Sequence, residues 1–197
     1  MELQSGILHA EEKDYKTSYS YFFEAFETYN TLNSKALALR ALQYMLLAKI
    51  MMGSPQDVPS LLSGKVALQY KHADVDSLMK IAKACVARAL HDFEAVQAQF
   101  APSLATDRFI VTHLRSLYGR LLEQNLSRLI EPYSRVELAH VAKLIDLPVA
   151  AVEKQLSQMV LEGTIDGIID QGQGYFIVFD EKPVDRSFPA ARNTIAE

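Results

Sequence analysis

The change of pattern between residues 131 and 180 constrains the fold more than any other feature of this sequence. Apolar residues first recur at i, i+3, i+4 and i+7 from Leu138, as they do on one face of a helix. A second helix is expected from Pro148, which suits the first helical position, to Gly163, which suits the stop. The β-rich runs "TIDGII" and "YFIVF" then flank "DQGQG", which indicates a hairpin. Helix, turn, helix and hairpin in this order are typical of a winged helix.

Residues 1 to about 130 have a helical pattern throughout. Polar residues that precede periodic segments are predicted to cap helices, and one pair has the S-x-x-E spacing of a capping box. These residues are Asp14, Ser34, Asp74 and Asp107, with Ser134 and Glu137 as the capping box. The helix after Asp74 is expected to continue to Pro102, and Gly119 to mark a kink or a close helix contact.

Aromatic residues recur at spacings of three and four from Tyr15 to Tyr29 and so share one helical face. We interpret this stripe as a packing surface rather than a ligand cage. With the preceding "GILHAEEKD" it resembles a tetratricopeptide-like (TPR-like) helical hairpin, in which Ala25 is the small residue beside bulky ones. No second copy with a 34-residue period is recognisable, so any repeat is degenerate.

The predicted fold is therefore mainly α: helical hairpin repeats followed by a winged-helix module with a small antiparallel β-sheet. The expected divisions are the TPR-like part at 1–130, the winged helix at 131–181 and a tail, the start of a C-terminal helix, at 182–197. Half of the residues are apolar (49%), no apolar run reaches 18 residues, and the single cysteine fits a reducing compartment. We expect a cytoplasmic and nuclear protein that does not bind membranes.

The charge of the winged-helix module argues against nucleic acid as a partner. Between Ser134 and Glu181 there are three Lys or Arg and eight Asp or Glu, which gives 3 − 8 = −5. Binding to nucleic acid draws much of its affinity from Lys and Arg that displace counterions from phosphates. Gln155 and Gln158 could read base edges but could not hold a phosphate backbone.

No pattern of reactive or metal-binding residues indicates an enzyme, a metal, a cofactor or a small-molecule substrate. The five histidines lie far apart, and neither H-x-H nor H-E-x-x-H occurs. His9 and Glu12 share a helical face that is expected to be solvated. "GQG" at Gly172 lies between strands, which favours a turn over a phosphate cradle. Cys85 lies among small apolar residues and is expected to be a buried hydrophobe.

Several stretches together resemble the 26S proteasome non-ATPase regulatory subunit 11 family: "YSYFFEAFETYN", "LLEQNLSRLIEPYSRVELAHVAKLIDL", "VEKQLSQMVLEG" and "GIIDQGQG". The resemblance runs from Leu3 to about Arg186. It implies a PCI domain, a non-catalytic scaffold of the proteasome lid in ubiquitin-dependent degradation, and other PCI subunits joined side by side through their winged helices. It also implies that an N-terminal helical solenoid and most of a C-terminal helix are missing, that "FPAARNTIAE" is a remnant, and that Met1 is an added start.

The exposed edge of the hairpin is the candidate interaction site, because edge strands offer unpaired N–H and C=O groups to a partner strand. The candidate residues are Thr164, Ile165, Ile168, Tyr175, Ile177 and Phe179. If Ile177 bonds outward, proline there is expected to block assembly without unfolding the protein. Two alternatives remain open: a PCI subunit of a signalosome or translation-initiation complex, and a winged-helix nucleic-acid binder.

Overall fold

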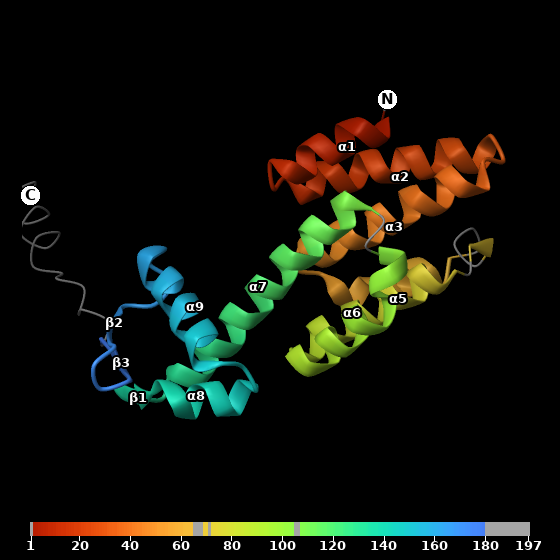
Figure 1. The fold of residues 1–197 in the computed structure, drawn as a ribbon. Coiled ribbons are helices and arrows are strands. Elements are labelled where there is room, and N and C mark those ends of the chain that lie inside the picture. The colour runs from red at the N-terminus through yellow and green to blue at the C-terminus, as the bar shows by residue number, and fades with distance from the viewer. Residues whose placement is uncertain (1, 65–68, 71, 105–106, 180–197) are drawn as a thin grey trace, which may run out of the picture. The chain divides into compact units, whose positions relative to one another are not determined.

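The computed structural model describes residues 2–64, 69–70, 72–104 and 107–179 (Figure 1). The chain forms two compact parts, Met1–Leu122 and Glu123–Glu197, and the division lies inside one long helix. We refer to them as the helical part and the winged-helix part. The predicted tail at 182–197 lies outside the described residues.

The helical part is built from helices that pack in chain order, α1 on α2, α2 on α3, and α5 on α6 (Figure 1). This arrangement confirms the predicted series of helical hairpins. The elements are α1 (Glu2–Glu11), α2 (Tyr15–Thr31), α3 (Lys35–Met51), η1 (Pro55–Asp57), α4 (Val58–Leu62), α5 (Ala73–Ala87), α6 (Leu90–Leu104) and α7 (Arg108–Ile130), the last of which continues into the second part.

Two of the predicted helix caps have the expected side-chain bonds, and two predictions are wrong. Asp14 accepts from the Thr17 N–H at 3.2 Å, and Asp107 accepts from the Phe109 N–H at 3.0 Å. Asp74 does not cap α5, because the helix begins at Ala73, two residues earlier than predicted, and His72 occupies the cap. The helix after it does not continue to Pro102 either. Arg88 adopts a left-handed conformation (φ 54°) that ends α5, and α6 then continues through Pro102 to Leu104. Ser34 occupies the cap of α3 without a side-chain bond.

The aromatic stripe of α2 packs into the core of the helical part, as predicted. Phe22 is fully buried and meets the rings of Tyr44 and Phe109 edge-on, at centroid distances of 5.4 and 5.9 Å. Gly6 of α1 allows this packing, since a Cβ atom there would lie 2.5 Å from the Phe22 ring. Ala25 is buried as expected. The stripe is therefore a core and not a ligand cage.

A polar cluster joins α3 to the start of α7. The Tyr44 hydroxyl donates to Asp107 Oδ2, and Arg40 bonds both the tyrosine oxygen (2.9 Å) and the carboxylate (3.1 Å). Burial raises the pKa of Tyr44 to about 12, and the bond to the Asp107 carboxylate adds to the rise. Because Asp107 also caps α7, this one carboxylate fixes two helices to each other.

The winged-helix part contains the end of α7, two short helices and a three-stranded antiparallel sheet with strand order β1-β3-β2 (Figure 1). Its elements are β1 (Arg135–Glu137), α8 (Leu138–Ile145), α9 (Val149–Leu161), β2 (Gly167–Asp170) and β3 (Tyr175–Val178). Its buried apolar side chains are Leu126, Ile130, Val136, Leu138, Val141, Ala142, Val152, Leu156, Met159 and Phe176. The winged helix and the antiparallel hairpin are confirmed.

Several local predictions in this part are wrong. Ser134 and Glu137 do not form a capping box, because Arg135–Glu137 pairs with β3 as a strand and α8 begins after it. Pro148 is the cap of α9 rather than its first residue. Gly163 does end this helix, with φ +71°. In the helical part, a Cβ atom on Gly119 of α7 would have no neighbour within 4 Å, so this glycine does not mark a close helix contact either.

Candidate interaction surface of the winged helix

The strand register shows which backbone groups form the edges of the sheet. β3 pairs with both other strands, Val136 opposite Phe176 on one side and Ile168 opposite Ile177 on the other. In an antiparallel ladder, the backbone N–H and C=O groups of alternate residues bond to the neighbouring strand, and those of the residues between them point away from it, which we call outward-bonding. Two hydrogen bonds continue the ladders beyond the strand ends, from Val178 N–H to Ser134 C=O and from Phe179 N–H to Asp166 C=O. They determine which residues of each strand bond to β3 and which do not. The outward-bonding residues are therefore Arg135 and Glu137 on β1, and Gly167 and Ile169 on β2.

This register corrects the prediction for Ile177. β3 is the central strand of the sheet, so the Tyr175 and Ile177 backbones bond to β2 and are not at an edge. Proline at Ile177 would remove a ladder bond and disturb the fold. Sequence patterns missed this because β1 is only three residues long and two of them are charged.

The other predicted residues lie around the hairpin rather than within one strand. Thr164 and Ile165 precede β2, which begins at Gly167, and Phe179 follows β3. All three line an open groove of about 760 Å³ in the winged-helix part. The remaining lining residues are Ser127, Ile130, Glu131, Pro132, Tyr133, Ser134, Gly163, Asp166 and Val178.

Four of the six predicted residues, Ile168, Tyr175, Ile177 and Phe179, have side chains on the face of the sheet that points away from the buried core. We call this outward side the sheet face. Val136 and Phe176 are buried, so their strand neighbours point the other way. The row Arg135, Ile177 and Ile168 crosses all three strands on this outward side. Tyr175 on β3 has the same alternation as Ile177, and Phe179, directly after β3, continues it with a bond from its N–H to Asp166 C=O. Ile168 is 55% exposed and Phe179 is 49% exposed.

Arg135 is the functional candidate that sequence reasoning did not find. Its guanidinium lies 4.0 Å from the centre of the Tyr175 ring, and one of its nitrogens donates to Gln173 Oε1 at 2.8 Å. None of the ion pairs between described residues includes it. The signal in the sequence was weak, because the contact crosses between β1 and β3 and depends on an unpredicted strand.

The potentially reactive side chains of the described residues have the following surroundings. No group of three or more His, Cys, Asp or Glu among them could hold a metal ion. Cys85 is partly buried, and this burial raises the pKa of its thiol to about 11, which keeps the sulfur protonated at neutral pH. His113 lies against Phe109 and Tyr15 in the core of the helical part. His9 and Glu12 form a surface pair at 3.7 Å.

No helix within the described ranges has the length and apolar character needed to cross a membrane.

Comparison with known proteins agrees with this architecture. The PCI domain family matches residues 97–180. Over 196 residues, covering 99% of this chain and 47% of the relative, the sequence is 50% identical to the 26S proteasome non-ATPase regulatory subunit 11 of Dictyostelium discoideum. It is also 50% identical to the Arabidopsis thaliana homologue of that subunit (100% of this chain, 46% of the relative). Identity to the 26S proteasome regulatory subunit RPN6 of Saccharomyces cerevisiae is 39% over 201 residues (100% and 46%).

The chain spans about half the length of the relatives it matches. Within that span, the residues that match the PCI domain include the winged helix, and about half of the aligned residues are identical to those of the first two relatives. Residues 97–180 of the chain therefore match the PCI domain, and nearly the whole chain is similar to about half the length of proteins named 26S proteasome non-ATPase regulatory subunit 11.

Proposed function

We propose that the chain belongs to a non-catalytic scaffold subunit of the 26S proteasome lid, and that its winged helix joins neighbouring PCI subunits during ubiquitin-dependent degradation. The observation that carries this proposal is the 50% identity, over 99% of the chain, to a subunit whose name places it in the 26S proteasome. The same proposal places the protein in the cytoplasm and nucleus, with other PCI subunits as partners.

Affinity purification of the tagged full-length protein, followed by mass spectrometry, tests this proposal. Lid subunits are expected in near-equal amounts to the bait. Recovery of signalosome or translation-initiation subunits in their place would overturn the proposal, and so would a bait that stays alone.

The two sheet edges differ in chemistry, and the difference favours β2 as the joint. Arg135 and Glu137 place charges along β1, and charges on an edge strand discourage pairing with another chain. On β2, Ile168 and Ile169 carry no charge until Asp170 closes the strand. A partner strand can therefore reach the outward groups of Gly167 and Ile169 with less desolvation of charge.

Paired substitutions at each edge identify the joint. Ile169→Pro removes the outward N–H of β2, and Ile169→Ala removes the same side chain but keeps the N–H. Glu137→Pro and Glu137→Ala do the same on β1, where the Glu137 φ of −77° already suits proline. We expect Ile169→Pro alone to lose incorporation into the lid. If all four folded variants assemble equally, the strand-pairing joint is wrong.

The hydrogen bonds made by two glutamines of α9 argue against the nucleic-acid alternative. Gln155 donates to Glu123 at 3.2 Å, and Gln158 donates to Glu162 at 2.6 Å, so both amides already have partners. We expect no binding to duplex DNA or RNA tighter than the roughly 10⁻⁴ to 10⁻⁶ M of non-specific contacts. A low-micromolar or tighter affinity that falls steeply with added salt, measured by fluorescence anisotropy, would support the alternative.

A further inference from the structure

The sheet face carries a strip of apolar side chains where a solvated sheet would be polar. An antiparallel sheet with one face on the core normally carries polar side chains on the other. Here Ile168, Ile177 and Phe179 lie on the outward side, together with the ring of Tyr175. Each exposed apolar residue alone would be unremarkable, but neighbouring ones on one face mark a surface that is covered in use.

Arg135 places a positive charge, on a side chain fixed by its neighbours, at one end of this apolar strip. Stacking on Tyr175 and the bond to Gln173 fix the plane of the guanidinium, so little side-chain freedom remains to be lost on binding. A stacked arginine beside a tyrosine is also the composition enriched in interface hot spots. Since none of the ion pairs between described residues uses this charge, a carboxylate from a partner fits it.

The next row of the sheet face limits where that carboxylate can lie. Glu137, Tyr175 and Asp170 are opposite one another across β1, β3 and β2, so this row is acidic at both ends. A partner carboxylate would be repelled there and attracted only at the Arg135 end. The charges therefore give the partner a direction across the strands.

The shape of the surface selects a helix as the partner element. A strand adds to the edge of a sheet, whereas an open sheet face is covered by another layer, commonly a helix. From Ile168 to Arg135 is two strand spacings, or about 10 Å. At about 1.5 Å per residue, a helix crosses that distance in roughly seven residues, which is two turns.

We propose that the sheet face, defined by Arg135, Ile168, Tyr175, Ile177 and Phe179, docks an amphipathic helix of a neighbouring lid subunit. The helix presents apolar side chains to the isoleucines and an Asp or Glu, about two turns away, to Arg135. This inference rests on the proposed function for the identity of the assembly. It differs from the edge joint, which pairs strands through the backbone.

Site-specific photocrosslinking in the intact particle tests the proposal. The full-length protein carries p-benzoylphenylalanine in place of Ile168 and, as a matched control, in place of Leu161 at the end of α9, which is 83% exposed. The particle is purified, irradiated and digested. We expect the Ile168 position to crosslink to a helical segment of another subunit that has a carboxylate about seven residues away, and the Leu161 position not to reach that segment.

Other products from the Ile168 position would overturn the proposal. These are a crosslink to this chain's own residues after Phe179, to a second copy of the chain, or to a segment without the acidic residue, and the absence of any crosslink. Absence of the protein from the particle, seen in the purification before irradiation, would instead overturn the proposed function.

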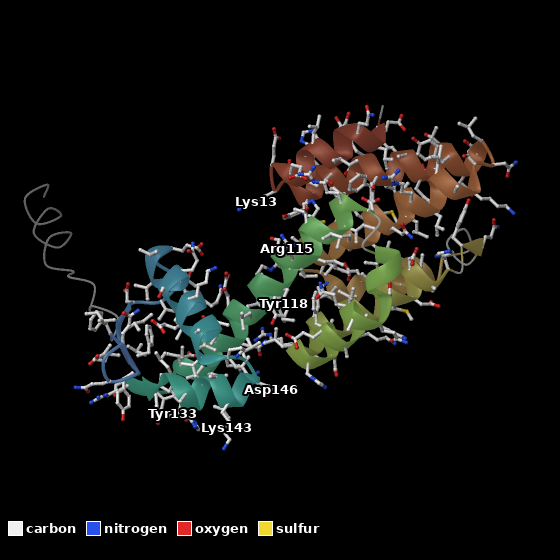
Figure 2. All side chains as sticks on the ribbon, in the orientation of Figure 1. Lys13, Arg115, Tyr118, Tyr133, Lys143 and Asp146 are labelled. Atoms are coloured by element: carbon white, nitrogen blue, oxygen red, sulfur yellow. The ribbon has the colours of Figure 1, made fainter. Side chains whose placement is uncertain are left out.

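Charge and apolar substitutions provide a second, independent readout. In a competition with wild-type protein for incorporation, Arg135→Glu and Ile168→Asp are each expected to fall by at least about tenfold. Their matched controls, Lys143→Glu and Leu161→Asp, are expected to stay within about twofold. Lys143 projects away from α8 into solvent (Figure 2). Equal behaviour of a sheet-face variant and its control would contradict the proposal, with circular dichroism of each purified variant confirming that it folds.

Discussion

The helical part and the winged-helix part differ in how many of their large apolar side chains are exposed. The helical part fully buries the rings of Phe22, Tyr44 and Phe93, and the winged-helix part fully buries that of Phe176. The winged-helix part is the shorter one, yet among the described residues it has six of the eleven exposed large hydrophobic side chains: Tyr133, Leu144, Val149, Leu161, Ile168 and Phe179. For its length, the winged-helix part therefore exposes more large apolar side chains, which favours it as the part that a partner covers in some of these places.

The largest expected effect is the loss of a ring from the helical core. Phe22→Ala is expected to lower the free energy of unfolding by about 3–5 kcal/mol, because it leaves a cavity beside Tyr44 and Phe109. Its neighbour Phe23, which is 40% exposed, supplies the control, and Phe23→Ala is expected to cost under about 1 kcal/mol. Urea denaturation measures both. Equal losses would mean that the core is not where the structure places it.

Disruption of the polar cluster between α3 and α7 is expected to have the next largest effect on stability. Asp107→Ala removes the cap of α7 and the acceptor of Tyr44, and is expected to cost about 2 kcal/mol. Asp107→Asn keeps a capping oxygen and should recover part of that loss. If the alanine variant is as stable as wild type, the cluster does not fix the two helices.

The stability of the helical part is expected to depend on pH through His113. Burial lowers the pKa of this histidine in the folded protein below the ordinary value of about 6.5, with Glu11 acting weakly in the opposite direction. The unfolded state then binds the proton more readily, so stability falls as the pH drops below about 6.5 towards the folded pKa. Unfolding free energies between pH 5 and 8 should show this slope in the wild type and a shallower one in His113→Gln. Identical slopes would remove His113 as the cause.

Two glycines give the smallest effects, and these have opposite signs. Gly163→Ala in the winged-helix part places a side chain at φ +71° and is expected to cost about 1 kcal/mol. Gly119→Ala in α7 meets open space in a helix and is expected to stabilise by about 0.5–1 kcal/mol. Differential scanning calorimetry of both variants shows whether the signs differ, and a shared sign would contradict this account.

Sequence periodicity predicted the features that depend on local spacing. The α2 stripe, the caps at Asp14 and Asp107, and the hairpin all follow from residues within one or two turns of each other. The errors concern features that depend on distant partners. Arg135–Glu137 became a strand because β3, some forty residues later, offers it a ladder, and that pairing moved Ile177 from a supposed edge to the centre.

The candidate site was predicted in part for the same reason. Alternation along β3 groups Tyr175, Ile177 and Phe179, and this grouping is visible in the sequence. The place of Ile168 beside them depends on the register of β2, and the contact of Arg135 with Tyr175 depends on β1. A sheet face is set by pairing between strands, which the spacing within one strand does not encode.

Hydrogen–deuterium exchange of the full-length protein, alone and within purified 26S particles, tests most directly that the winged helix is the joint. The account predicts that amides of 134–138 and 164–179 gain protection on assembly, since partner elements cover the sheet face and the β2 edge. Amides of α2 and α3, already in a closed core, should change little. Unchanged exchange at the sheet in an intact particle, with new protection confined to the helical part, would contradict the account.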